Sequence, residues 1–165
     1  MRDWRKERRD ERPVGSYDLH GRYTLGLAYA NTYHIGMSSL GFQRVYHLVH
    51  QFPEWSCERL FADGVGVPVS VETGTPLAAF GVVAFSVSFE EDYLHLLRML
   101  DRARVPRRRT ERRAEDPLIV VGGPCAYNPE PMADFFDCAI IGDAEEAVLD
   151  GLVEADIKAA VESLP

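Results

Sequence analysis

Residues 82–88 read VVAFSVS, a continuous and mostly apolar run. Such a run is typical of a strand in the middle of a parallel sheet, where both faces are buried. The runs TLGLAYA at 24–30 and LIVVGG at 118–123 have the same character. CAIIG at 138–142 is a shorter candidate and SCERLFA at 56–62 a weaker one. We therefore expect five buried strands.

Helical spacing appears between these runs. Within residues 41–52, four apolar side chains recur at i, i+3, i+4 and i+7, which predicts a helix with one buried face. These are Phe42, Val45, Tyr46 and Val49. After the run at 82–88, Ser88 and Glu91 have the spacing of a capping box, so Ser88 is the expected N-cap of a second helix. Its predicted core face is Tyr93, Leu96, Leu97 and Leu100.

The remaining connections differ from one another. Residues 64–80 contain glycines and prolines without a helical stripe, so we expect turns and a short extended piece. Asn128 is a candidate cap and Pro129 suits the first position of a short helix. Asp143 and Glu146 repeat the capping spacing before a last helix at 144–155.

Alternating strands and helices predict an α/β fold with a parallel sheet covered on both faces. Because there are five strands and no dinucleotide-binding fingerprint, we favour the flavodoxin-like, doubly wound order 2-1-3-4-5 over the Rossmann order. We expect a polar arm at 1–22, the domain at 23–155 and a tail at 156–165.

In that order, three loops converge at the carboxyl ends of the strands, where ligands bind in open α/β sheets. They are NTYHIGMSSLG at 31–41, SVSFEE at 86–91 and VGGPCAYNPEP at 121–131. Small side chains allow a bulky ligand to approach the backbone, and hydroxyls and amides supply neutral hydrogen bonds. His34 and His20 could serve as bases, but neither has a neighbouring nucleophile with a recognisable signature. The loops therefore indicate a ligand-binding module rather than a complete catalyst.

Composition and charge exclude several classes. With 46% apolar and 27% charged residues the chain is typical of a globular protein, and no apolar run reaches the length of a membrane span. The first 13 residues lack the apolar region of a signal peptide, so we expect a cytoplasmic location. The three cysteines have no zinc spacing. Residues 102–113 carry seven arginines, which we interpret as a solvated loop in preference to a nucleic-acid contact.

Three segments together resemble the N-terminal domain of a family of uncharacterised radical SAM proteins, in which a cobalamin-binding-like domain precedes a radical SAM barrel. They are LAYANTYHIGMSSLGFQRVYHLV at 27–49, FSVSFEEDYLHLLRMLDRARVP at 85–106 and LIVVGGPCAYNPEPMADFFDCAIIGDAEE at 118–146. The resemblance extends over roughly residues 23–150.

The resemblance implies a cobalamin site. Cobalamin-binding domains of the flavodoxin-like type have a DxHxxG loop after the first strand, a serine motif after the third and a double glycine after the fourth. Residues 31–36 read NTYHIG, which keeps the glycine of the first motif and changes both polar residues. The implied cofactor-binding residues are Asn31, Tyr33, His34, Gly36, Ser38, Ser86, Ser88, Gly122 and Gly123.

Two departures qualify what is implied. In the full motif a histidine coordinates cobalt, but Tyr33 occupies that position, and a neutral phenol with a pKa near 10 is no equivalent. His34 is shifted by one residue. The sequence also lacks the CxxxCxxC cluster motif. SAM and a [4Fe–4S] cluster would therefore bind in a downstream domain, with the radical SAM barrel of the same polypeptide as the partner, and this chain would be an excised or truncated piece.

Two alternatives stay open. The first is a degenerate scaffold or docking domain without a cofactor, whose loops would be packed shut by Tyr33, Met37, Phe89 and Tyr127. The second is a flavin or phosphate module, in which Thr32, Ser38 and Ser39 would line a turn at a helix N-terminus.

Overall fold

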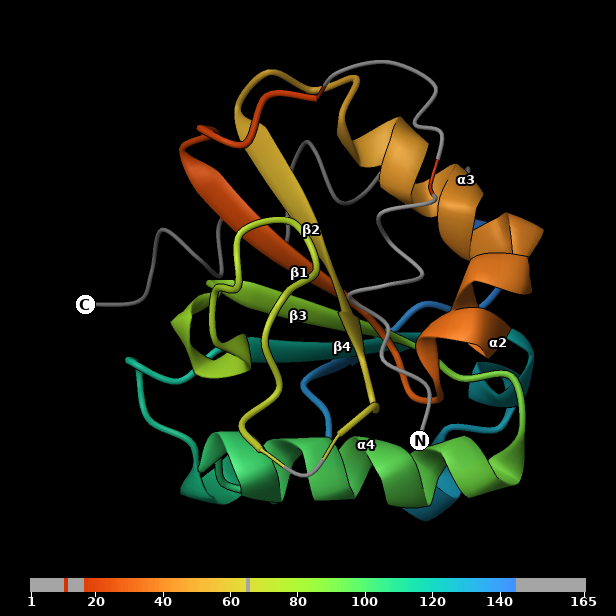
Figure 1. Ribbon diagram of the computed structural model, residues 1–165. Helices are drawn as coiled ribbons and strands as arrows, with labels where there is room; N and C mark the ends of the chain where they lie inside the picture. Colours follow the sequence, from red (N-terminus) through yellow and green to blue (C-terminus); the bar gives the residue numbers. More distant parts are fainter. Residues whose placement is uncertain (1–10, 12–16, 65, 145–165) are drawn as a thin grey trace.

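Five parallel strands form one sheet in the order β2-β1-β3-β4-β5 in the computed structural model (Figure 1). The structure describes residues 11, 17–64 and 66–144. The strands are β1 (Tyr23–Tyr29), β2 (Trp55–Phe61), β3 (Val82–Ser86), β4 (Leu118–Gly122) and β5 (Cys138–Ala139). The order, the parallel pairing and the flavodoxin-like α/β class confirm the prediction.

The two long helices lie on opposite faces of this sheet, α3 (Leu40–Val49) on one and α4 (Glu90–Ala103) on the other (Figure 1). Successive side chains of β4 point alternately to the two faces of the sheet. Val120 packs in the cluster that contains Phe42 and Leu48 of α3. Ile119 and Val121 pack in the cluster that contains residues of α4. The central strands are continuously apolar because each side chain in the sheet centre is buried in one of the two hydrophobic clusters, one on each face of the sheet.

Helix α4 begins later than its sequence pattern predicts. The predicted N-cap, Ser88, lies outside the helix, and Phe89 occupies the cap position. The capping carboxylate belongs to Asp92, which accepts the backbone N–H groups of Ser88 and Phe89 at 2.9 and 3.0 Å. Asp92 is 1% exposed, so the helix start is fixed by a buried carboxylate rather than by the predicted serine–glutamate pair.

The described residues of the crossover from β2 to β3 contain no α-helix, as the glycines and prolines of 64–80 predict. It contains an isolated antiparallel bridge between Val69 and Pro76 and a 3₁₀ turn, η1 (Leu77–Ala79). Glu58 on β2 accepts hydrogen bonds from the Ser70 and Thr73 hydroxyls, both at 2.6 Å. The crossover is thus tied to the outer strand.

A charged network lies on the same edge strand. Arg59 of β2 is 8% exposed and donates its Nε to Glu72 at 2.6 Å. Its two terminal nitrogens reach Glu11 at 3.0 Å. These carboxylates raise the pKa of Arg59 against the opposing effect of its burial. The network joins the N-terminal segment and the β2–β3 crossover to one buried guanidinium.

The region after β4 contains 3₁₀ turns where the sequence predicts a short helix. These are η3 (Pro124–Tyr127) and η4 (Glu130–Met132), which follow η2 (Arg109–Glu111) in the chain. Pro129 is the N-cap of η4, and Asn128, the predicted cap, is instead the C-cap residue of η3. The predicted last helix at 144–155 and the tail at 156–165 lie almost entirely outside the described residues. In the described part of the chain, no helix has the length and apolar character needed to cross a membrane.

Candidate functional site

A cavity of about 500 Å³ lies beside α3, over the face of β1, β3 and β4. Its floor is apolar and its mouth is formed by small residues and by the loops after β3 and β4. The floor consists of Leu25, Leu27, Ala84, Val120 and Ile140. The mouth and walls include Ser39, Gly41, Phe42, Ser86, Ser88, Gly122, Gly123, Tyr127 and Gly142. This is the edge of the sheet at which the sequence predicts a ligand.

Gly123 brings two of these loops together. Its φ of +102° lies in the region that favours glycine, and an added Cβ would come within 2.8 Å of the Val87 carbonyl oxygen. The Val87 N–H donates to the Gly122 carbonyl at 2.8 Å, and the Cys125 N–H donates to the Val87 carbonyl at 3.2 Å. The double glycine therefore allows the β4 loop to pair with the β3 loop along one wall of the cavity.

The two predicted serines, Ser86 and Ser88, both line the cavity. Because Ser88 does not cap α4, its hydroxyl is available to the site, where it lies 3.0 Å from the Tyr29 hydroxyl. Tyr29 is the last residue of β1. This pair supplies a donor and an acceptor at the level where the strands end.

The segment NTYHIGMSSLG, predicted as a polar loop, instead contains a short helix, α2 (Tyr33–Ser38). The N–H of Tyr33 at its start donates to the Asp63 carboxylate after β2. Gly36 is buried, and a Cβ there would come within 2.4 Å of the Phe61 ring. The helix therefore packs against β2, the outer strand.

This packing separates the nine predicted site residues into two groups. Ser86, Ser88, Gly122 and Gly123 line the cavity. The other five, Asn31, Tyr33, His34, Gly36 and Ser38, do not.

Tyr33, which occupies the metal-ligand position of the cobalamin motif, is 5% exposed. Its ring packs edge-on against Phe61 at 5.0 Å, and its hydroxyl donates to Glu11. His34 is exposed on α2. The Ser38 hydroxyl donates to the Ile35 carbonyl at 2.6 Å. The side chains of this segment are thus used mostly for local structure.

Asp92 holds two of the loops near the cavity, a role that the sequence pattern does not predict. Besides the two backbone N–H groups, it accepts the Asn31 side-chain amide at 3.2 Å. One buried carboxylate therefore joins the loop after β1 to the loop after β3. The signal in the sequence is its place three residues after Phe89, but Glu91 gave a competing pattern.

Among the described residues, no cluster of three or more His, Cys, Asp or Glu side chains could hold a metal ion. The cysteines form no disulfide: Cys57 is buried, Cys125 is partly buried and Cys138 is exposed. Burial raises the pKa of the Cys57 thiol well above its ordinary value, so this thiol is a core group without nucleophilic character.

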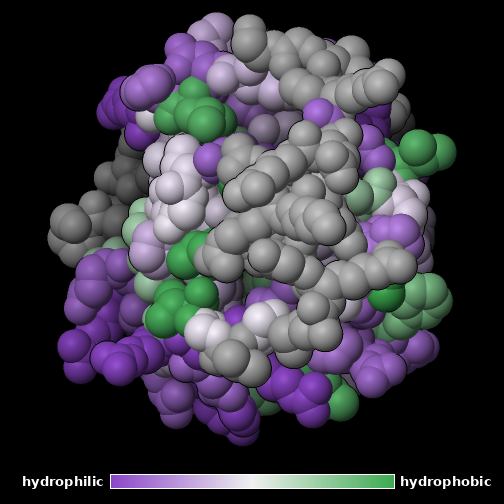
Figure 2. Space-filling view, in the orientation of Figure 1, coloured by the Kyte–Doolittle hydropathy of each residue, from purple (hydrophilic) through white to green (hydrophobic). Residues whose placement is uncertain are grey.

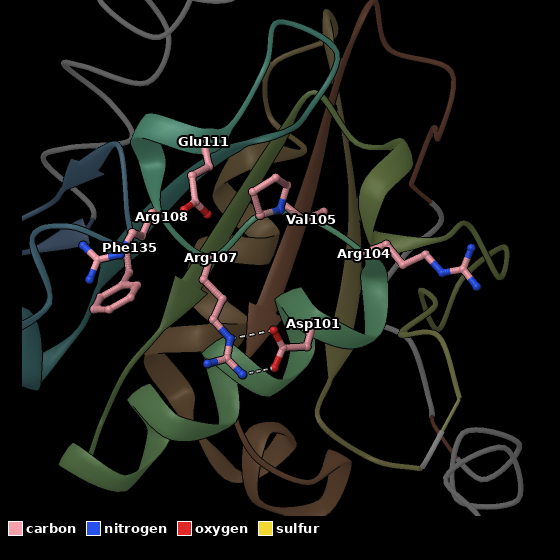
Figure 3. A pocket seen from close by; sticks show the side chains of 8 residues that line it. Asp101, Arg104, Val105, Arg107, Arg108, Glu111 and Phe135 are labelled. Atoms are coloured by element: carbon pink, nitrogen blue, oxygen red, sulfur yellow. Dashed lines mark hydrogen bonds and ion pairs between the residues drawn. The ribbon is translucent and has the colours of Figure 1, made fainter.

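Most arginine side chains of the cluster at 102–113 are exposed, as the predicted solvated segment requires, and four of them pair with acidic side chains. Figure 3 shows Arg107 directed at Asp101, with Arg104 pointing away from this pair. Arg108 pairs with Asp134 at 2.5 Å. The hydrophilic surface at the lower left of Figure 2 lies over this region.

Arg112 is a nearly buried member of the cluster, with a side chain 5% exposed. It donates to the carbonyl groups of Pro106, Arg107 and Phe135 at 3.1–3.2 Å and to the carboxylate of Asp137 at 3.1 Å. Pairing of this kind reduces the charge that the cluster offers to a phosphate backbone.

Comparison with known protein families relates the chain to a described family. The model of the family described as radical SAM proteins, N-terminal, matches residues 41–161, which is most of the chain. Searches of curated proteins and of solved structures found no match.

Proposed function

The chain belongs to the family of radical SAM proteins, N-terminal, and we propose that it is a cofactor-binding module that holds cobalamin without a histidine ligand to cobalt. The observation that carries this proposal is the cavity of about 500 Å³ beside α3, at the carboxyl ends of the central strands. Chemistry that needs SAM and an iron–sulfur cluster would belong to another domain of the polypeptide.

The residues that line the cavity fit the nucleotide tail of a cobalamin. The tail ends in a flat, apolar benzimidazole, and the cavity floor is formed by aliphatic side chains such as Leu25, Leu27 and Val120. Gly122 and Gly123 keep one wall free of side chains. The Ser86 and Ser88 hydroxyls would supply neutral hydrogen bonds to the ribose and phosphate. Bound cobalamin would carry the methyl group or take part in the radical step of the parent enzyme.

The position of α2 supports a cobalamin site without a histidine ligand. Tyr33 is buried against Phe61, and its hydroxyl is bonded to Glu11, so it does not face the cavity. His34 lies on the exposed side of α2. We therefore assign this domain the binding and orientation of the cofactor, with no protein nitrogen bound to cobalt.

The degenerate scaffold is the second candidate. It predicts loops packed shut by four large side chains, and Tyr33 is indeed buried. Phe89 and Tyr127, however, are 61% and 66% exposed, and Tyr127 borders the cavity instead of filling it. These two exposures favour the ligand-binding function over the scaffold.

The flavin or phosphate module is favoured less. Two of the three hydroxyls that it needs already have local partners, since Ser38 donates to Ile35 and Ser39 accepts the Phe42 N–H at the start of α3. The third residue, Thr32, lines a different cavity. A phosphate at this position would have to displace the Ser39 cap.

The radical SAM barrel of the same polypeptide is the partner that we propose for the exposed apolar rim. We use the name rim for five exposed side chains on the segments that follow β1, β3, β4 and β5: Ile35, Leu40, Phe89, Tyr127 and Ile141. A single exposed apolar residue is ordinary, but several on the segments at one end of the sheet are what a surface covered by another domain would have.

The experiment is retention of cobalamin. The protein is incubated with hydroxocobalamin, passed through a desalting column, and its visible spectrum is recorded. We expect the corrinoid absorbance to elute with the protein in about equimolar amount. Elution of a folded protein without corrinoid would reject the proposal.

A matched pair of variants locates the binding. Gly122→Val adds a side chain to the cavity wall, where a Cβ meets its nearest neighbour, Ile140, at 3.7 Å and is tolerated. Gly66→Val adds the same group at a loop position with open space. We expect Gly122→Val to lower retention at least tenfold and Gly66→Val to leave it unchanged.

A further inference from the structure

A second cavity, of about 480 Å³, lies on the α4 face of the sheet, between α4 and the segments that follow β1 and β2. It shares no lining residue with the cavity beside α3. Its lining is polar and basic: Asn31, Thr32, Ala62, Gly64, His95, Arg98, Asp101 and Arg102.

Arg102 is held in place by backbone carbonyls. Its Nε donates to Gly66 at 2.7 Å, and its terminal nitrogens donate to Ala62 and Asp63 at 3.2 Å. Desolvation lowers the pKa of this guanidinium, an effect that the negative charge of Asp63 partly opposes. The Arg102 guanidinium is thus partly desolvated, and its direct hydrogen-bond partners are neutral carbonyl groups. Its positive charge can therefore still attract an anion.

Arg98 lies one helical turn before Arg102, on the same face of α4. Its side chain is exposed, and it has no hydrogen bond or ion pair within the part of the chain that the structure describes. Two guanidinium groups therefore border one cavity, one fixed and one able to close on a ligand.

The acidic groups nearby are already engaged. Arg107 holds both carboxylate oxygens of Asp101, as the dashed lines in Figure 3 show. Asp63 accepts the Tyr33 N–H. The cavity therefore keeps an excess of positive charge although Asp101 is part of its wall.

Two further polar side chains complete the arrangement. Thr32 has an exposed side chain on the loop after β1, and its hydroxyl is in reach of a ligand in the cavity. His95 is oriented by its Nδ1, which lies 2.9 Å from the Ala30 carbonyl oxygen. Two planar guanidinium groups beside a hydroxyl are a donor set that matches a tetrahedral oxyanion.

We propose that this cavity binds a phosphate group, with Arg102 as the fixed cation and Arg98 as the cation that closes on the ligand. The site does not depend on cobalamin, because it lies on the opposite face of the sheet and uses other residues. Free phosphate and the phosphate of a nucleotide share this chemistry.

The test is a titration of the ¹⁵N-labelled protein with inorganic phosphate at constant ionic strength, followed by NMR. We expect saturable shifts of the amides of Thr32, Ala62 and Gly64. Arg98→Gln should weaken binding about tenfold. Arg113→Gln is the matched control, because it removes an equal charge from an exposed arginine paired with Glu115, and it should bind as the parent does.

A parallel titration with adenosine monophosphate distinguishes a site for free phosphate from a site for a nucleotide. Tighter binding of the nucleotide assigns the site to a nucleotide, and equal binding assigns it to free phosphate; either result supports the proposal. Equal shifts with chloride, or unchanged affinity in Arg98→Gln, would overturn it. Since Arg98 is exposed, its variant is expected to fold, which keeps the result interpretable.

Discussion

Gly123 illustrates how much one residue determines at this site. Its double-glycine motif can be recognised in the sequence, but the reason for it is visible only in the fold, where the backbone passes close to Val87. Asp92 shows the opposite case. The capping pattern in the sequence pointed to Glu91 instead of Asp92, whereas burial and three hydrogen-bond donors make Asp92 the residue that joins two loops. Long-range contacts of this kind cannot be read from local patterns.

Gly123→Ala is expected to destabilise the protein by roughly 1–3 kcal/mol, because the positive φ is strained for alanine and the new Cβ meets the Val87 carbonyl. The measurement is the urea midpoint of unfolding. Gly41→Ala is the control: Gly41 lies in α3 with open space around it, so alanine should stabilise by about 0.5–1 kcal/mol. Equal midpoints for the two variants would contradict this account.

The thiols are expected to differ sharply in reactivity. Cys138 is exposed, whereas burial raises the pKa of Cys57 and removes it from solvent. With iodoacetamide near pH 8, mass spectrometry should find Cys138 alkylated first and Cys57 unmodified until urea unfolds the chain. Early modification of Cys57 in the native protein would show that the core around β2 is wrongly described.

At the scale of elements, strands were easier to predict than helix ends. Continuous apolar runs identify β1, β3 and β4 to within about two residues, because burial on both faces leaves little alternative. Helix α2 was not predicted, since its six residues lack a helical stripe and it is stabilised by contacts with Phe61 and Asp63 across the sheet edge. The start of α4 was misplaced because two acidic residues compete for one capping role.

Substitutions on the two sides of α4 test which side of this helix faces the core. Leu96 is 1% exposed in the core, whereas Leu94, two residues earlier, is 55% exposed. Leu96→Ala should cost about 2–5 kcal/mol of unfolding free energy, as large-to-small changes in a core do. Leu94→Ala should cost well under 1 kcal/mol. Chemical denaturation of both variants checks the orientation of the helix.

The end of α3 gives the protein a pH dependence. Desolvation lowers the pKa of His50, which stacks on Tyr17 at 4.3 Å and lies with its Nε2 3.1 Å from the Cys57 carbonyl oxygen. Below pH about 6.5 the unfolded chain binds a proton on this residue that the folded chain resists. The free energy of unfolding should therefore fall as the pH decreases from 7 to 5.

His50→Gln removes the titrating group and keeps a side-chain donor. Its unfolding free energy should depend less on pH over the same range than that of the parent protein. Identical pH profiles for the two proteins would mean that His50 does not carry this dependence.

At the scale of the whole molecule, the fold was predictable and the site only in part. The strand order follows from the number of strands and their alternation with helices, and it places the carboxyl-end loops together. The strand order does not reveal which of the predicted residues line the cavity, because α2 turns the segment after β1 toward β2. The glycine and serine motifs line the cavity, while the residues around Tyr33 pack elsewhere.

Hydrogen–deuterium exchange with and without hydroxocobalamin tests the central claim most directly, because it reports both binding and its location. We predict slower exchange on binding in the peptides that cover residues 39–45, 84–88 and 120–124, which border the cavity beside α3. No change in any of these peptides, or protection confined to the α4 face, would contradict the account.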